Sequence, residues 1–113
     1  MLFRSEAFRG ILADRGEKTE LLRVDGKFQK KVVGSVGESR EIGSKIKKED
    51  WNDYHIIAKG NILIHILNGR VAMVAIDEQD SVRAREGIVA LQMHVGQPFK
   101  VEYRNIRLRT LQP

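Results

Sequence analysis

The feature that most constrains the fold is a pair of β-rich runs joined by Asn68-Gly69. Residues 62–67 and 71–76 consist almost entirely of Ile, Leu, Val, Met and Ala. The Asn-Gly dipeptide readily takes positive φ at both positions of a two-residue turn, as a type I′ hairpin requires. The sequence therefore predicts an antiparallel hairpin here. Residues 54–58, followed by the turn signal Gly60-Asn61, add a third strand and make a meander.

Two other parts of the chain also predict strands. Residues 21–24 and 28–33 flank Asp25-Gly26 and predict a second hairpin. In residues 87–95 the apolar side chains alternate with Gln92 and His94. A strand over this segment would therefore place these two polar side chains together on one face.

The last strand is expected over residues 101–108, where the apolar period slips at Arg104-Asn105 and predicts a β-bulge. Residues 34–50 are expected to form a long loop with a short strand at 44–47, and residues 77–86 a loop or one helical turn. Short strands between turn signals predict an all-β fold, an antiparallel β-sandwich or jelly roll. With 113 residues, the chain is expected to form a single domain, 1–113.

The composition excludes several classes of protein. The chain has no cysteine, so disulfide scaffolds, thiolate zinc sites and cysteine nucleophiles are excluded. Its formal net charge is +5, but the Lys and Arg residues are not gathered in one segment. This distribution favours solvated strand faces over a nucleic-acid partner. Charges interrupt every apolar stretch and the N-terminus lacks an apolar run of signal-peptide length, so neither a membrane span nor export is expected from the residues themselves.

Several strings follow, in order and spacing, the pattern of a known family. They are residues 2–6 (LFRSE), 10–16 (GILADRG), 51–61 (WNDYHIIAKGN), 68–69 (NG), 88–96 (IVALQMHVG) and 101–107 (VEYRNIR). On these strings the chain resembles the 3-keto-disaccharide hydrolase domain family over nearly its whole length. Residues 17–28 lack the family's Trp-Gly and Tyr-Asp-Glu pattern and its N-terminal strands have no counterpart, so a truncated member is expected.

The resemblance implies a fold, a location and a reaction. The fold is a concanavalin-like jelly roll that holds sugar on its concave face, and the location is periplasmic or extracellular, although this chain shows no signal peptide. The reaction is cleavage of glycosides oxidised to a ketone at sugar C3. Because the ketone acidifies the C2 hydrogen, a base can remove that proton and the C1 substituent can leave, after which water adds.

This chemistry needs a base, an acid for the leaving oxygen and a group that polarises the ketone. The resemblance implies that Glu6 and His94 are the acid/base pair and that Arg4 orients the ketone or the hydroxyls. Structural alternatives remain open. Arg4 and Glu6 are two residues apart on a strand and share a face, which also suits an exposed ion pair. His94 could be a solvated histidine before the turn at Gly96.

Substrate-binding residues are expected at Asp14, Gln92 and Trp51. Asp14 would face the site from the next strand and Gln92 would supply a hydrogen bond. Trp51 could stack on a sugar ring or pack at the edge of the sheet, and packing is favoured. His55 and His65 have apolar neighbours and are expected to be structural. Because the histidines lack a compact ligand motif, no metal and no cofactor are predicted.

A second class of function stays open, namely a non-catalytic carbohydrate-binding or interaction module on the same fold. The absence of the N-terminal strands, and of the expected aromatic and acidic residues after Gly16, favours it. Missing strands would leave sheet edges open, and open edges tend to pair with another chain, so a homo-oligomer is expected. The expected partner is a sugar or 3-keto-sugar, with no nucleic acid and no membrane.

Overall fold

The computed structural model describes residues 2–4, 9–93 and 95–112, with side chains from residue 11 onward. The chain falls into two units, residues 1–83 and residues 84–113. Among the described residues, all of the strands and one short helix belong to the first unit. The described chain is nearly all sheet and loop, which confirms the all-β class.

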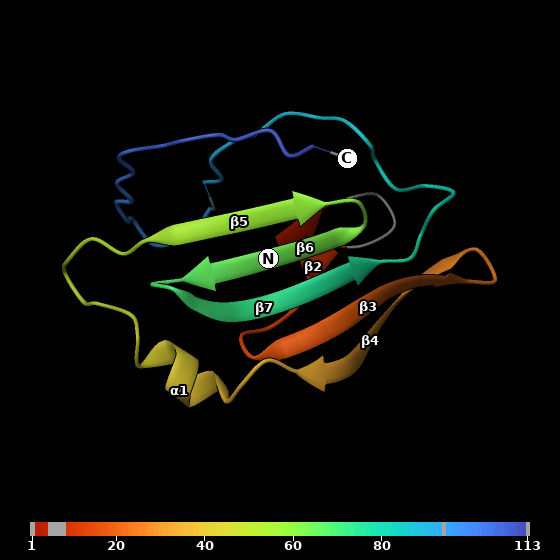
Figure 1. Ribbon diagram of the computed structural model, residues 1–113, viewed down its shortest axis with the longest axis horizontal. Helices are drawn as coiled ribbons and strands as arrows, with labels where there is room; N and C mark the ends of the chain where they lie inside the picture. The colour runs from red at the N-terminus through yellow and green to blue at the C-terminus, as the bar shows by residue number, and fades with distance from the viewer. Residues whose placement is uncertain (1, 5–8, 94, 113) are drawn as a thin grey trace. The chain divides into compact units, whose positions relative to one another are not determined.

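The first unit is built on a five-stranded sheet in the order β4-β3-β7-β6-β5 (Figure 1). Its strands are β3 (Glu17–Val24), β4 (Lys27–Ser35), β5 (Tyr54–Lys59), β6 (Ile62–Leu67) and β7 (Arg70–Asp77). A separate two-stranded sheet pairs β1 (Leu2–Arg4) with β2 (Arg9–Ile11). All of these pairs are antiparallel except β3–β7, which is parallel, so the large sheet is mixed.

The three predicted turns all form. Asn68 and Gly69 have φ of 48° and 78°, and Asp25 and Gly26 have φ of 51° and 74°, as type I′ turns require. Gly60 has φ of 59° and closes β5 onto β6, with Lys59 opposite Ile62. The predicted hairpin, the predicted meander and the second hairpin are therefore confirmed, with β3 starting four residues earlier than expected, at Glu17.

One face of the sheet carries the core, because alternate residues of each strand point to the same side. Leu12 and Ala13, which follow β2, form the core together with Leu21, Met73 and Ala75. The hydroxyl of Thr19, itself fully buried, donates to the carbonyl of Leu12 at 3.0 Å. The segment after β2 is thus attached to the inner face of the sheet by both packing and a buried hydrogen bond.

The opposite face of the sheet is also apolar. It carries Ile64 and Ile66 from β6 and Val74 and Ile76 from β7, all half-buried. Antiparallel sheets with one solvated face usually alternate apolar and polar residues, whereas sheets covered on both faces do not. The pattern in β6 and β7 is therefore typical of strands that are covered on both faces.

The short strand predicted at residues 44–47 is wrong. The chain forms α1 (Ser39–Gly43) just before it, and the N–H of Ser44 donates to the carbonyls of Arg40 and Glu41. Ile42 is fully buried and anchors this helix. A single apolar residue flanked by polar ones shows no period, so sequence alone did not distinguish a helical turn from a strand.

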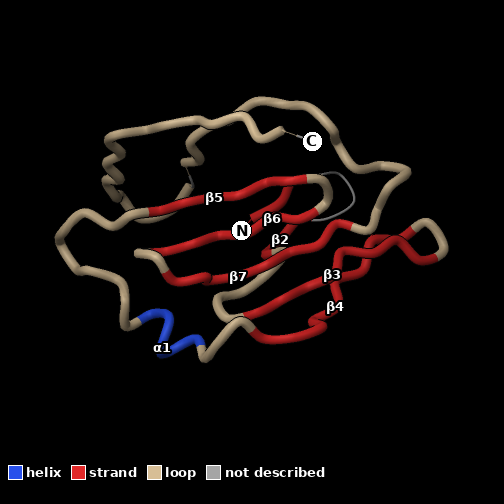
Figure 2. Tube along the Cα trace, in the orientation of Figure 1, coloured by secondary structure: helices blue, strands red, loops and turns tan. Residues whose placement is uncertain are grey.

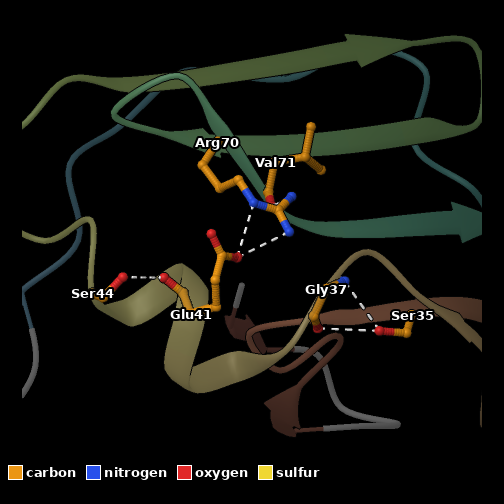
Figure 3. A network of polar contacts seen from close by, with 6 residues as sticks. All are labelled: Ser35, Gly37, Glu41, Ser44, Arg70 and Val71. Carbon is orange, nitrogen blue, oxygen red and sulfur yellow. Dashed lines mark hydrogen bonds and ion pairs between the residues drawn. The ribbon is translucent and has the colours of Figure 1, made fainter.

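An ion pair joins α1 to β7 (Figure 3). Nη2 of Arg70 lies 3.1 Å from Oε2 of Glu41, and Nε of Arg70 donates to the same oxygen at 3.1 Å. Nη1 of Arg70 also donates to the carbonyl of Val71 at 3.2 Å. Beside this pair, at the end of β4, the hydroxyl of Ser35 donates to the carbonyl of Gly37 and accepts from the N–H of Gly37, both at 3.1 Å.

The strands predicted in the second unit are wrong for its described residues. Residues 87–93, residue 95 and residues 101–108 are drawn as loop (Figure 2), and no strand pairing involves them. Alternation shows that a segment can form a strand, but a strand also needs a partner for its backbone hydrogen bonds. The apolar side chains stay exposed, with Ile88 at 92% and Val95 at 94%. At the predicted bulge, Asn105 has φ of 55° in a loop.

Asp77 ends β7, and residues 78–86 form a loop with one turn, which agrees with the expectation for this segment. The N–H groups of Val82 and Arg83 both donate to the carbonyl of Gln79, and Nη1 of Arg83 lies 2.6 Å from Oδ1 of Asp80. In the part of the chain described, no helix has the length and apolar character needed to cross a membrane.

Gly16 occupies the junction between three strands and requires a glycine. Its φ is 94°, its N–H donates to the carbonyl of Ala72 at 2.7 Å, and its carbonyl accepts from Val36 at 2.9 Å. A Cβ added here would lie 2.7 Å from the carbonyl oxygen of Gly37. A side chain would therefore be both strained at its own backbone and in collision with a neighbouring one.

We expect Gly16→Ala to lower the free energy of unfolding by about 2–3 kcal/mol, because strain and collision act together. Gly26→Ala is the matched control, since Gly26 also has positive φ, at 74°, but an added Cβ would meet nothing within 4 Å. Its expected cost is about 1 kcal/mol. Urea denaturation measures both. An equal loss of unfolding free energy in the two variants would show that the collision with the carbonyl of Gly37 does not contribute.

Candidate functional site

Three charged side chains from separate segments meet at the start of the β3–β4 hairpin. Asp14 lies in the turn after β2, Glu17 is the first residue of β3, and Lys30 lies in β4. The turn forms because the N–H of Glu17 donates to the carbonyl of Asp14 at 3.0 Å while Gly16 takes positive φ. Glu17 shares its face of β3 with Thr19 and the core. We call these three residues the acid–lysine cluster.

Two ion pairs and a backbone hydrogen bond hold the acid–lysine cluster together. Nζ of Lys30 lies 3.3 Å from Oε1 of Glu17 and 3.9 Å from Oδ2 of Asp14. The backbone N–H of Asp14 donates to the same Glu17 oxygen at 2.7 Å. This backbone bond, and to a smaller extent Lys30, lowers the pKa of Glu17, against the opposing effect of burial. Glu17 is therefore ionised at neutral pH.

The acid–lysine cluster offers groups that suit a polyhydroxylated or carbonyl ligand. Glu17 and Lys30 are mostly buried, with side chains 23% and 22% exposed, whereas the Asp14 side chain is 63% exposed. Asp14 can accept hydrogen bonds from hydroxyl groups, and an ammonium ion can donate to hydroxyl or carbonyl oxygens. The mutual contacts hold these groups in position before any ligand arrives, which lowers the cost of binding.

A second polar pair lies on the same inner face of the sheet but toward its opposite edge, where β5 meets β6. The hydroxyl of Tyr54 forms a hydrogen bond with Nδ1 of His65, and the two rings meet edge to face with centroids 5.3 Å apart and planes at 89°. Tyr54 lies opposite Leu67, so His65 is its diagonal neighbour on the same face. Burial lowers the pKa of His65, and partial burial raises the pKa of Tyr54.

The residues expected at the site are found in different places. Arg4 lies in β1 opposite Arg9, while Glu6 and His94 lie outside the described residues. Asp14 belongs to the acid–lysine cluster. Gln92 is exposed in a loop of the second unit, not on a strand.

Trp51 lies in the loop before β5, at the opposite edge of the sheet from β4. Its side chain is 39% exposed, and its N–H donates to Oδ1 of Asp50. The described contacts thus bring Asp14 together with Glu17 and Lys30, and they do not bring it together with Trp51.

Sequence reasoning missed Glu17 and Lys30, although a signal for both was present. Continuing the alternation of β3 backwards from Leu21 through Thr19 places Glu17 on the core face. Lys30 is directly opposite Leu21 across the hairpin and so lies on the same face. A carboxylate and an ammonium on the core face of one hairpin are expected to pair, since unpaired buried charges are costly.

The residues described show no assembled metal site. Within residues 2–4, 9–93 and 95–112, no three His, Asp or Glu side chains gather closely enough to hold a metal ion. His65, which could ligate a metal as neutral imidazole, uses Nδ1 for the bond to Tyr54. No described residue set therefore indicates a metal ligand sphere.

Comparison with known proteins gives one finding for this chain. Residues 10–109 match the model of a family described as the 3-keto-alpha-glucoside-1,2-lyase-like domain. A search of the curated proteins found no match, and a search of the solved structures found none either. The family description names a glucoside, so the match links the chain to carbohydrates and agrees with the resemblance seen in its motifs.

The buried His65 makes stability depend on pH. Because its pKa is below 6.5 in the folded protein, the unfolded chain binds this proton more readily, and the free energy of unfolding falls as pH drops below about 6.5. We expect His65→Gln to remove this part of the slope between about pH 7.5 and about pH 5.5. Glu17, with a pKa below 4.5, titrates outside this window.

Chemical denaturation across that window measures the slope for each variant. His55→Gln is the control, because it makes the same substitution at a histidine that is exposed on β5. A His65→Gln protein with an unchanged slope would contradict the assignment of this pH dependence to His65.

Proposed function

Since the chain belongs to the 3-keto-alpha-glucoside-1,2-lyase-like domain family, we propose that it cleaves glycosides that carry a ketone at sugar C3. The observation that carries this proposal is the family match, which spans residues 10–109. A base takes the C2 proton, the C1–O bond breaks, and the leaving oxygen takes a proton from an acid. Water then adds to the resulting double bond and gives the free 3-keto sugar.

The proposed catalytic residues are those that the motifs indicate. Glu6 and His94 act as the acid/base pair, and Arg4 orients the ketone or the neighbouring hydroxyls. A histidine suits this role because its pKa lies near neutrality, and a carboxylate can serve as its partner in proton transfer. Arg4 is supported by its place in β1, which pairs with β2, the strand that leads into the segment attached to the inner face of the sheet.

The proposed substrate-binding residues are Asp14, Gln92 and Trp51, and we add Lys30 because of its ion pair with Asp14. Asp14 has an exposed carboxylate held beside the ammonium of Lys30. That ammonium can donate to the ketone oxygen as negative charge develops there after loss of the C2 proton. The pairing with Glu17 fixes the ammonium in place, so Lys30 needs no reorganisation when the ligand binds.

We further propose that residues 1–113 act as one domain and that the chain forms a homo-oligomer through open sheet edges. The family match runs from the first unit into the second, which supports a single functional domain. Two strands, β4 and β5, lie at the edges of the five-stranded sheet, which supports assembly by edge pairing.

The second candidate function is a non-catalytic carbohydrate-binding module. The observation that favours it is the mutual satisfaction of Glu17 and Lys30, which leaves the acid–lysine cluster better suited to hold a ligand than to abstract a proton. Turnover separates the two candidates, because only the enzyme releases a 3-keto sugar.

We expect the purified chain to release the 3-keto sugar from a 3-keto-disaccharide, and Glu6→Gln and His94→Ala each to lower the rate by about 100-fold or more. The assay is run with and without added divalent metal ions. Glu20→Gln, on the opposite face of β3 from Glu17, is the control and should keep the original rate. Full activity in both Glu6→Gln and His94→Ala would contradict their assignment as the acid/base pair. Binding without turnover by the unsubstituted chain would favour the carbohydrate-binding module.

Binding is tested separately from turnover with Lys30→Gln. We expect the Kd for a 3-keto-disaccharide to rise about tenfold, because a hydrogen bond from a charged donor is lost. Lys31→Gln is the matched control, since Lys31 is the next residue of β4 and lies on its other face. Isothermal titration calorimetry gives both values, and equal affinities in the two variants would remove Lys30 from the site.

A further inference from the structure

The two edges of the five-stranded sheet differ in charge. The edge strand β4 carries Lys27, Lys30 and Lys31, and its pairing with β3 is interrupted by a bulge. Charged side chains and bulges are the usual protection of an edge against pairing with another chain. The edge strand β5 has no Lys, Arg, Asp or Glu between residues 54 and 58, and its described pairing with β6 has no register shift.

The backbone of β5 presents a regular row of unpaired groups. Gly60-Asn61 is a two-residue turn, so Lys59 and Ile62 form the hydrogen-bonded pair next to it. The bonded pairs alternate along an antiparallel ladder, so the N–H and C=O groups of Tyr54, Ile56 and Ala58 point away from β6. Among the described residues, no strand pairs with this side of β5.

The side chains of β5 are unusually apolar for an edge. Tyr54 is 57% exposed and Ile56 is 52% exposed, and both lie on the inner face of the sheet with His65. An exposed, apolar, regular edge is a template for another strand. A strand that pairs with β5 must also place charges of opposite sign beside Asp53 and Lys59, at the two ends of β5.

We propose that β5 pairs antiparallel with β5 of a second copy of this chain, about a two-fold axis at Ile56. The proposal rests on the proposed homo-oligomer and identifies its edge and register. Ile56 lies opposite Ile56 of the second copy, and Tyr54 lies opposite Ala58. These are the residues whose backbone groups point outward, so the pairing joins the two five-stranded sheets into one.

Charge selects this register over its neighbour. Centred on Ile56, the pairing places Asp53 of each copy opposite Lys59 of the other, so opposite charges meet at both ends. Neither residue has an ion pair within the described part of the chain, and both are exposed. Centred on Ile57, the pairing would place Lys59 opposite His55 and Asp53 opposite Asn61. The first register is self-complementary, as an interface with two-fold symmetry must be.

Disulfide trapping tests the register directly, since the chain has no cysteine of its own. In the proposed pair the two Ile56 Cα atoms lie about 5.5 Å apart, within the span of a disulfide. We expect Ile56→Cys to form a covalent dimer under mild oxidation. Val32→Cys, 54% exposed on the lysine-bearing strand β4, is the control and should stay monomeric on a non-reducing gel. Ile57→Cys should form a disulfide poorly, because residue 57 of one copy is a diagonal neighbour of residue 57 of the other, at about 7–8 Å.

Charge reversal tests the same interface without any covalent bond. Asp53→Lys places like charges at both ends, and we expect it to raise the dimer dissociation constant about tenfold. Asp53→Lys combined with Lys59→Asp restores opposite charges and should restore the affinity. Sedimentation equilibrium measures each constant. Ile56→Lys should abolish association, because it puts two like charges at the axis.

Several outcomes would overturn the proposal. They are a monomer at every concentration of the unsubstituted chain, equal trapping of Ile56→Cys and Val32→Cys, and a dimer that survives Ile56→Lys. Protection of the Tyr54, Ile56 and Ala58 amides from hydrogen exchange in a monomer would show that another segment of the same chain covers the edge, and would also overturn it. None of these readouts uses a sugar, so failure of the proposed activity is distinguished from failure of the dimer.

Discussion

The rest of the five-stranded sheet depends on the parallel pairing of β3 with β7, which we call the β3–β7 joint. The β3–β4 hairpin and the β5–β6–β7 meander are each held by local turns, and only this pairing makes them one sheet. It runs from Lys18 opposite Val74 to Leu21 opposite Asp77, and backbone bonds from Gly16 and Glu78 extend it at its two ends. The core lies across this joint, because Leu21 comes from one side and Met73 and Ala75 from the other.

The same β3–β7 joint also positions the acid–lysine cluster. Gly16 must approach the backbone of Ala72 and Gly37, and the turn that contains it also positions Asp14 and Glu17 beside Lys30. The acid–lysine cluster is therefore placed by backbone contacts and not by its own charges alone. Tyr54 and His65 lie beyond β7, on the meander, and belong to a different part of the inner face.

The sequence could predict the elements that depend on residues close together along the chain, such as turns and hairpins. Two Gly-containing dipeptides with positive φ at both positions, Asp25-Gly26 and Asn68-Gly69, located two hairpins and their registers. The β3–β7 joint could not be predicted, because it connects distant segments and has no local signal. The alternation of residues 87–95 predicted a strand that does not form among the described residues, since alternation reports the capacity to pair and not a partner. Of the acid–lysine cluster, the sequence singled out Asp14 but not Glu17 or Lys30, because their proximity to Asp14 depends on the hairpin register.

The unequal edges of the sheet also decide how far assembly can go. A sheet with two adhesive edges adds copies without end and grows into a fibre. Here Lys27 and Lys31 are exposed on β4, so a copy that approaches this edge meets a row of like charges. In the proposed dimer, association through β5 would occupy this edge of the five-stranded sheet in each partner and would leave the lysine-bearing strand β4 at both outer margins. The proposed dimer would therefore be closed, with a fixed number of subunits, and would avoid open-ended polymerisation.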